Sequence, residues 1–292
     1  MKMFSKSQIK IIWNISNILL IIIIFFIIVS VLLRIILMLG SQSDKYKPNL
    51  QNDGVIIIPN FISDVEIQNI KTNINNNEIN KAKQYIINSN NIQTKIAQLF
   101  GNDYEFHDYI FLIKKSQFHT CHRDYNGNFF NEGQQFPSYT IIIYLEDMHA
   151  CLDVIPKSHK SKDAYNYNLT DYTKTLYCNH GDAILFDANL IHNGSLNYNE
   201  NSMRIQMKIS NKADRKVLDF YNNYNKMLNA ENNTPMAIKQ IQKHVSCQFP
   251  AISYFIKQYD FNKNKTVSAD VDKLSIFANI FSSAFTELEN VA

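Results

Sequence analysis

The sequence predicts a mostly β core that is flanked by helices and preceded by a membrane-spanning helix. Between about residues 104 and 210, short apolar runs alternate with clusters of turn residues. Such a pattern is typical of a β-sandwich or a double-stranded β-barrel. Residues 18–39 are almost entirely apolar, and from about residue 212 onward the apolar spacing becomes helical. These three observations define an anchor, a β domain and a helical C-terminal extension.

The N-terminal segment predicts a transmembrane helix over residues 18–39, "ILLIIIIFFIIVSVLLRIILML". A helix of this length is about 33 Å long, close to the thickness of a bilayer core. Its one charged residue, Arg34, lies near the end, where a long side chain can reach the headgroups. The run is longer than that of a signal peptide and has no small-residue cleavage site. We therefore expect residues 1–40 to form a single-pass membrane anchor, with basic residues on both sides that leave its orientation open.

A polar linker and the start of the domain follow the anchor. Residues 41–50, "SQSDKYKPNL", contain a proline and read as the linker, so that the domain proper covers residues 51–210. "DGVIIIPNF" predicts a turn and a short strand. Ser63, followed three residues later by Glu66, is a capping box that predicts the start of a helix. The rough apolar face of this helix consists of Val65, Ile67, Ile70 and Ile74.

Five runs are predicted as strands: "YIFLIKK", "SYTIIIYL", "CLDVIP", "AILFD" and "RIQMKIS". The C-terminal extension, residues 211–292, contains three segments that read as helices: "ADRKVLDFYNNYNKML", "AIKQIQKHV" and "DKLSIFANIFSSAF".

Charge and cysteine content exclude some classes of protein. The formal net charge is +3, and no basic stripe with interleaved aromatic residues is present, so we expect no nucleic-acid partner. The cysteines are scattered and form no CxxC, so neither a disulfide framework nor a cysteine zinc site is expected. Scattered thiols are more typical of a reducing compartment. The four positions are Cys121, Cys151, Cys178 and Cys247.

One histidine and one aspartate lie two positions apart in "TCHRDYNGN". On a β-strand, residues i and i+2 point to the same side, so His122 and Asp124 would project together and Arg123 would point away. "GDAILFDANLIHNGS" supplies a third donor, His192, at the end of a predicted strand. Two imidazoles and one carboxylate leave three metal positions open, as non-haem Fe(II) oxygenases require.

Arg204 begins a predicted strand on which Arg204, Gln206 and Lys208 share one face. If the opposite, apolar face packs against helices, Arg204 points into the barrel. A buried guanidinium suits a bidentate carboxylate, which a cosubstrate could supply. The alternative is a surface arginine on an edge strand.

The order of these motifs along the chain resembles that of a known enzyme family. The order "HRD", "IPKSHK", "GDAILFD…LIHNGS" and Arg204, together with the opening "DGVIIIPNFISDVEIQNIK", resembles the phytanoyl-CoA dioxygenase-like family of Fe(II)/2-oxoglutarate oxygenases over about residues 49–210. The resemblance implies a double-stranded β-helix, or jelly roll. It also implies that His122, Asp124 and His192 ligate iron, that Arg204 holds the distal carboxylate of 2-oxoglutarate, and that Ser195 assists.

The chain departs from the family pattern at two loops. Lys157 stands where "PGSH" has glycine, and "HAC" replaces the usual Asn-Gly before the next strand. His159 in this loop is implied to be structural. The presence of Asp124 argues against a halogenase, which leaves the carboxylate position open for halide.

The resemblance implies an Fe(II)- and 2-oxoglutarate-dependent dioxygenase that uses O₂, hydroxylates a small-molecule or lipid-like substrate, and releases succinate and CO₂. One alternative is a membrane-anchored prolyl hydroxylase-like oxygenase, which favours lysine at the position of Arg204 and lacks "PKSHK". The other is a catalytically inactive binding module of the same fold. The substrate and the oligomeric state cannot be read from the sequence.

Overall fold

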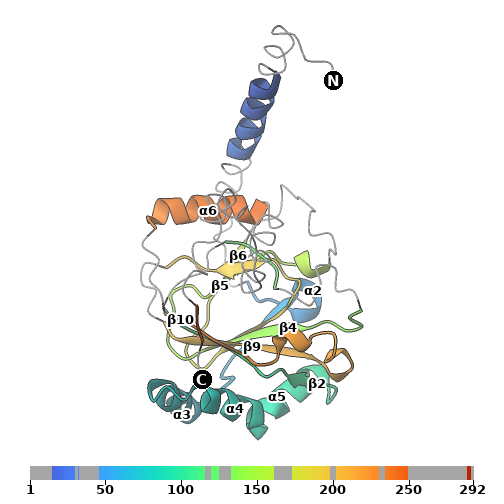
Figure 1. The fold of residues 1–292 in the computed structure, drawn as a ribbon, viewed down its shortest axis with the longest axis vertical. Helices are drawn as coiled ribbons and strands as arrows, with labels where there is room; N and C mark the ends of the chain where they lie inside the picture. Colours follow the sequence, from blue (N-terminus) through green and yellow to red (C-terminus); the bar gives the residue numbers. More distant parts are fainter. Residues whose placement is uncertain are drawn as a thin grey trace, which may run out of the picture.

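The computed structural model describes residues 15–29, 32, 46–115, 120–124, 133–160, 173–197, 202–229, 234–248 and 288–290. Two β-sheets form the core, as the sequence predicts (Figure 1). The main sheet has eight strands in the order β1-β7-β4-β9-β3-β10-β11, with β2 paired to β9. The minor sheet has the order β6-β5-β8. Two facing sheets of this kind make a jelly-roll-like core.

The strands of the main sheet are β1 (Val55–Ile58), β2 (Tyr104–Phe106), β3 (Tyr109–Lys115), β4 (Tyr139–Tyr144), β7 (Ala183–Asp187), β9 (Arg204–Asn211), β10 (Tyr224–Asn229) and β11 (Leu288–Asn290). The minor sheet contains β5 (Leu152–Val154), β6 (Lys174–Leu176) and β8 (His192–Gly194). The helices are α2 (Leu50–Asp53), α3 (Asp64–Asn75), α4 (Ile79–Asn88), α5 (Asn90–Phe100) and α6 (Met236–Gln248), with 3₁₀ turns η1 (Ser158–Lys160), η2 (Lys212–Asp214) and η3 (Asp219–Tyr221).

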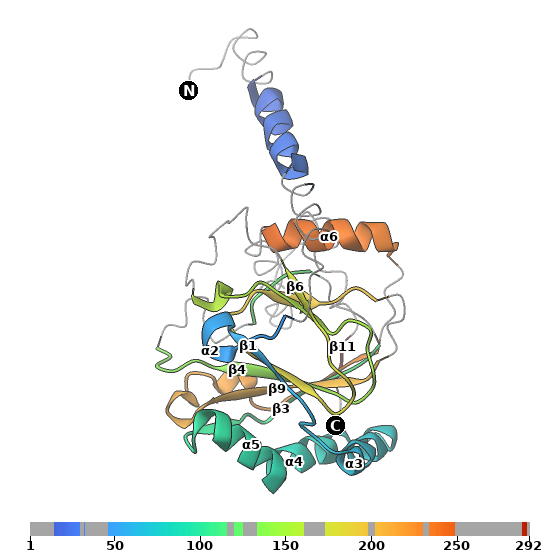
Figure 2. The same cartoon turned by 180° about the vertical axis from the view of Figure 1, so that it is seen from behind.

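Helices α3, α4 and α5 lie along the outer face of the main sheet, and α6 lies at the opposite side, beyond the minor sheet (Figures 1 and 2). The apolar side chains of β9 pack into the core beneath these three helices, as expected for a strand with one apolar face. They are Ile205, Met207 and Ile209. Because side chains alternate along a strand, the other face of β9 points into the space between the two sheets.

A second apolar cluster fills part of the space between the sheets. Ile142, Ile184 and Phe186 of the main sheet pack there with Leu152 and Val154 of the minor sheet. The polar face of β9 therefore lies beside a dry core, and its buried polar groups need partners.

The predicted strands and the first helix agree with the structure. All five predicted runs form strands, β3, β4, β5, β7 and β9. The Ser63 side chain accepts from the Glu66 backbone amide, and the Glu66 carboxylate accepts from the Ser63 backbone amide, which completes the predicted capping box. Val65 does not belong to the buried face of this helix, since it is 70% exposed.

The C-terminal part differs from its prediction. Residues 213–228 were expected to form a helix, but they contain the turns η2 and η3 and strand β10. β10 pairs in parallel with β3, so the main sheet continues beyond residue 210. The helix expected at "AIKQIQKHV" is present as α6. The helix expected at "DKLSIFANIFSSAF" lies outside the described residues.

The prediction of a transmembrane helix over residues 18–39 is corrected. In the described part of the chain, the N-terminal helix covers residues 15–29. No described helix is long and apolar enough to cross a membrane. This finding overturns the predicted single-pass anchor and the membrane localisation drawn from it; residues 30, 31 and 33–39 lie outside the described residues.

The expectation about cysteines is wrong for one pair. Cys121 and Cys247 form a disulfide across a sequence separation of 126 residues. The other two cysteines, Cys151 and Cys178, are reduced and buried, with their sulfur atoms 3.0 Å apart. The spacing of the cysteines in the sequence does not predict this disulfide, because only the fold brings α6 against the segment before His122.

Candidate active site

The three predicted metal ligands lie together between the two sheets. His122 and His192 form an isolated antiparallel bridge, in which each backbone amide donates to the other's carbonyl at 2.9 Å. The Asp124 amide donates to the Ala188 carbonyl at 3.0 Å, which fixes the second half of the HxD segment. One ligand atom from each of the three side chains lies within 4.8 Å of the others, and all three residues are buried.

Backbone contacts orient both imidazoles. His122 Nδ1 lies 2.9 Å from the Thr120 carbonyl oxygen, and His192 Nδ1 lies 2.9 Å from the Leu190 carbonyl oxygen. A carbonyl oxygen only accepts, so each Nδ1 carries the proton and each Nε2 keeps a free lone pair. Metal-binding histidines in proteins are commonly held in this way. Both Nε2 atoms face the same oxygen of Asp124, at 3.8 Å and 3.7 Å.

Arg123 points away from this site, as alternation predicts. Its Nη1 donates to the Ser158 carbonyl at 3.0 Å and to the Asn189 carbonyl. It therefore ties the HxD segment to the "PKSHK" loop. In that loop Lys157 has φ +69°, a left-handed conformation that favours glycine, so the loop keeps a glycine-like conformation without the glycine.

The second oxygen of Asp124 contacts residues of the main sheet. Lys208 Nζ lies 2.5 Å from Asp124 Oδ2 and 2.7 Å from Thr140 Oγ1. Thr140 Oγ1 in turn donates to Asp124 Oδ2 at 2.5 Å. Thr140 and Lys208 are cross-strand partners on β4 and β9, so both project from the inner face of the main sheet.

Arg204 lies further along the same inner face. It is buried, its Nη1 donates to the Ser202 carbonyl at 3.0 Å, and its cross-strand partner is Tyr144. Burial, followed by the nearby thiol of Cys151, raises the pKa of Tyr144, whereas the Arg204 charge lowers it. Among the described residues, Tyr144 Oη and Ser195 Oγ are buried without a hydrogen-bond partner. A buried hydroxyl without a partner on the residue opposite a buried guanidinium suits a carboxylate ligand.

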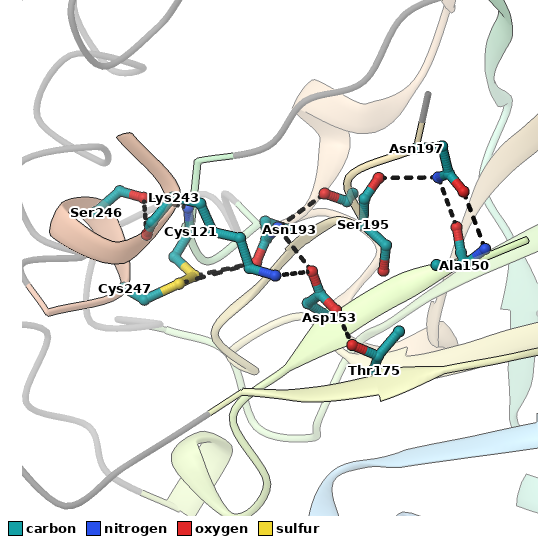
Figure 3. A network of polar contacts seen from close by, with 11 residues as sticks. Cys121, Ala150, Asp153, Thr175, Asn193, Ser195, Asn197, Lys243, Ser246 and Cys247 are labelled. Carbon is teal, nitrogen blue, oxygen red and sulfur yellow. Dashed lines mark hydrogen bonds and ion pairs between the residues drawn. A yellow bond between two sulfur atoms is a disulfide. The ribbon is translucent and has the colours of Figure 1, made fainter. Parts of the chain in front are cut away.

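The outer side of the minor sheet is fastened to α6 (Figure 3). Cys247 of α6 is bonded to Cys121, and Lys243 of α6 pairs with the buried carboxylate of Asp153 on β5. Asp153 Oδ2 also accepts from Asn193 Nδ2 at 3.3 Å. Asn193 belongs to β8 and directly follows the second predicted histidine ligand. Helix α6 thus supports the strand and the segment that carry the two histidines.

The structure brings together His122, Asp124 and His192, and Arg204 lies on the adjoining inner face of β9. Ser195 is buried, but no contact between it and Arg204 is recorded. Sequence reasoning missed Thr140 and Tyr144. The signal was available: both side chains end in a hydroxyl, and the two residues are four positions apart in the apolar run "YTIIIY", so they share one face.

Residues 78–205 match the family model described as phytanoyl-CoA dioxygenase. Among solved structures, the 2-oxoglutarate-dependent epimerase SnoN of nogalamycin biosynthesis is similar, at 14% identity and TM-score 0.46, over 56% of this chain and 80% of that chain. The carbocyclase SnoK has 14% identity and TM-score 0.45, over 55% and 80%. HygX from Streptomyces hygroscopicus, with nickel and 2-oxoglutarate bound, has 10% identity and TM-score 0.43, over 56% and 85%. No curated protein matches in sequence.

The family match and the buried His–Asp–His set define the class: the protein is a 2-oxoglutarate-dependent non-haem iron oxygenase. The matched segment contains all five residues of the predicted site and confirms the resemblance to the phytanoyl-CoA dioxygenase family. Iron and 2-oxoglutarate are the cofactor and cosubstrate of this class.

Proposed function

We propose that this protein hydroxylates a small organic substrate, with Fe(II) held by His122, Asp124 and His192. The observation that carries the proposal is the convergence of three buried ligand atoms within 4.8 Å, one from each residue. Two neutral imidazoles and one carboxylate match the ligand preference of Fe(II) and leave positions for two further ligands. When bound, Fe(II), 2-oxoglutarate and O₂ supply the oxidation, with succinate and CO₂ as co-products.

The chain's own residues prepare this site. The carbonyls of Thr120 and Leu190 hold both imidazoles in the tautomer that presents Nε2, so no rearrangement is needed for binding. The burial of all three ligands excludes water, which strengthens the electrostatic interactions inside the site.

Arg204 is proposed to bind the distal carboxylate of 2-oxoglutarate. Its guanidinium fork suits two parallel hydrogen bonds, and the hydroxyl of Tyr144, its cross-strand partner, is a further donor. The Ser195 hydroxyl is also buried without a hydrogen-bond partner and is proposed to assist. A dicarboxylate would provide an acceptor for the Tyr144 and Ser195 hydroxyls.

Replacing Asp124 with alanine tests the metal assignment. The variant should lose Fe(II) binding and all 2-oxoglutarate turnover, because two imidazoles alone leave the site without its charged ligand. Circular dichroism checks that the fold is retained, and Asp147→Ala, which removes an exposed carboxylate, is the control. Full activity of Asp124→Ala would show that the iron binds elsewhere.

Replacing Arg204 with alanine tests the cosubstrate site. Losing two charge-assisted hydrogen bonds, each worth about 1.5–3 kcal/mol, should weaken 2-oxoglutarate binding by about a hundredfold or more. Arg204→Lys should bind 2-oxoglutarate with an affinity between those of the wild-type protein and Arg204→Ala, since lysine keeps the charge but not the planar fork. The measurement is an anaerobic titration of the Fe(II) protein with 2-oxoglutarate. An unchanged dissociation constant in the alanine variant would show that Arg204 does not bind the distal carboxylate.

Assays of the wild-type protein distinguish the proposed function from the two alternatives, an inactive binding module and a prolyl hydroxylase. An inactive binding module would not decarboxylate 2-oxoglutarate, and a prolyl hydroxylase would convert a proline-containing peptide. Comparing the metabolites of cells with the wild-type protein and with Asp124→Ala would identify the substrate.

A further inference from the structure

Lys208 brings a positive charge to a site that is proposed to bind a metal cation. Its side chain is 4% exposed, and its ammonium lies 2.5 Å from Asp124 Oδ2. Burying an ammonium is costly unless it is paired. A lysine in this position has no place among the ligands or the carboxylate clamp, so its presence requires a separate explanation.

The two oxygens of Asp124 face different groups. Oδ1 faces the Nε2 atoms of His122 and His192 at 3.8 Å and 3.7 Å. Oδ2 accepts from the Thr140 hydroxyl at 2.5 Å and from the Lys208 ammonium. A carboxylate can bind a divalent cation through one oxygen or both. With two donors on Oδ2, only Oδ1 is presented to the imidazoles.

The surroundings of Lys208 favour a cation. Its Nζ lies 5.2 Å from the ring centroid of Tyr221 and 5.7 Å from that of Tyr109. Tyr109 is itself stacked on Tyr224 at 4.5 Å. Aromatic faces attract an ammonium group, and here they also close it off from water. The Lys208 ammonium is therefore in contact with Asp124, with the Thr140 hydroxyl and with two tyrosine rings.

We propose that Lys208 is a built-in counter-ion of the metal centre. Before the metal binds, its ammonium neutralises Asp124, so the three ligands can stay assembled without an unpaired buried charge. After the metal binds, it holds Oδ2 away, so that Asp124 acts as a one-oxygen ligand and leaves the remaining positions open. This role rests on the proposed function, because it requires Asp124 to be a ligand.

Removing the charge of Lys208 should change the affinity for metal and the affinity for 2-oxoglutarate in opposite directions. The ammonium repels a divalent cation, so removing its charge should strengthen metal binding. The same charge attracts the dianion 2-oxoglutarate, and it prevents Asp124 from taking a position that 2-oxoglutarate needs. Removing it should therefore weaken cosubstrate binding. A residue that merely supports the fold would weaken both.

The test uses the full chain and Co(II), whose visible absorption reports its binding without oxygen chemistry. Lys208→Met removes charge and hydrogen bond, whereas Lys208→Gln keeps a donor and is a second variant should the methionine protein fail to fold. Both should bind Co(II) at least tenfold more tightly and bind 2-oxoglutarate, in the Co(II)-loaded protein, at least tenfold less tightly. Lys83→Met is the matched control: it removes the charge of another buried lysine, which pairs with Asp108 and not with a ligand, and it should change either constant less than threefold.

The outcomes separate the two proposals. If the Lys208 variants bind metal and 2-oxoglutarate equally weakly, or if neither constant changes, the counter-ion role is overturned. A threefold or larger tightening of Co(II) binding in Lys83→Met would also overturn it, because the loss of a buried charge that touches no ligand would then have the same effect. If the wild-type protein binds no Co(II), or if His122→Ala binds it unchanged, the metal assignment itself fails.

Discussion

Lys157 occupies a backbone conformation, φ +69°, that disfavours any residue with a Cβ atom. The left-handed conformation costs about 1–2 kcal/mol, and glycine avoids that cost but loses roughly 0.5–1 kcal/mol through its freer unfolded chain. We therefore expect Lys157→Gly to raise the free energy of unfolding by up to about 1 kcal/mol in urea titrations. Lys157→Ala keeps the Cβ and should bring no gain. Equal stability of the two variants would mean that the conformation carries no strain.

At the scale of elements, α6 is fastened to the domain by a disulfide and a buried ion pair. A disulfide that closes so long a loop contributes about 2–5 kcal/mol. Cys247→Ser should therefore lower the stability of the domain and speed hydrogen exchange of the α6 amides. Dithiothreitol should do the same to the wild-type protein.

Two controls accompany this prediction. Cys178→Ser removes a buried thiol that forms no disulfide, and it should leave α6 exchange unchanged. Dithiothreitol should have no further effect on Cys247→Ser. If α6 exchanges equally slowly in every case, noncovalent contacts such as the ion pair with Asp153 and the hydrogen bond from the Cys121 amide to Ser246 are sufficient to hold the helix.

At the scale of the whole molecule, two buried groups give opposite pH dependence. Burial raises the pKa of Asp187 from 3.8 to about 6. Between these values the unfolded chain is ionised while the folded one is protonated, so stability is lost as pH rises. Burial lowers the pKa of His107 from 6.5 to about 4. Here the unfolded chain binds the proton first, so stability is lost as pH falls from 6.5.

Each shift corresponds to about 3 kcal/mol, so the two contributions nearly offset each other between pH 4 and 6.5. Asp187→Asn should remove the contribution of Asp187 and leave a protein whose stability falls on acidification, because only the His107 contribution remains. His107→Gln should show the reverse, with stability lost as pH rises. Urea unfolding at several pH values measures both, and the double variant should have the flattest profile. Parallel profiles for all variants would contradict the pKa shifts.

The sequence by itself determined the features that depend on near neighbours. Short apolar runs between turn clusters predicted strands such as β3 and β7, and alternation of side chains predicted the polar face of β9. The capping box of α3 was readable because Ser63 and Glu66 are three residues apart. The spacing of His122 and Asp124 already indicated that they share a face. These patterns are local, so backbone geometry alone relates them to structure.

Only the tertiary structure decided the rest. β10 is a strand because it pairs with β3, a long-range interaction that overrides its helix-like apolar spacing. The disulfide and the pairing of Lys208 with Asp124 join positions 126 and 84 residues apart. The apolar N-terminal run predicted a spanning helix, but no described helix has the required length and apolarity. Contacts between distant segments leave no periodic signal in the sequence, and burial between the sheets is what makes the charge of Lys208 matter.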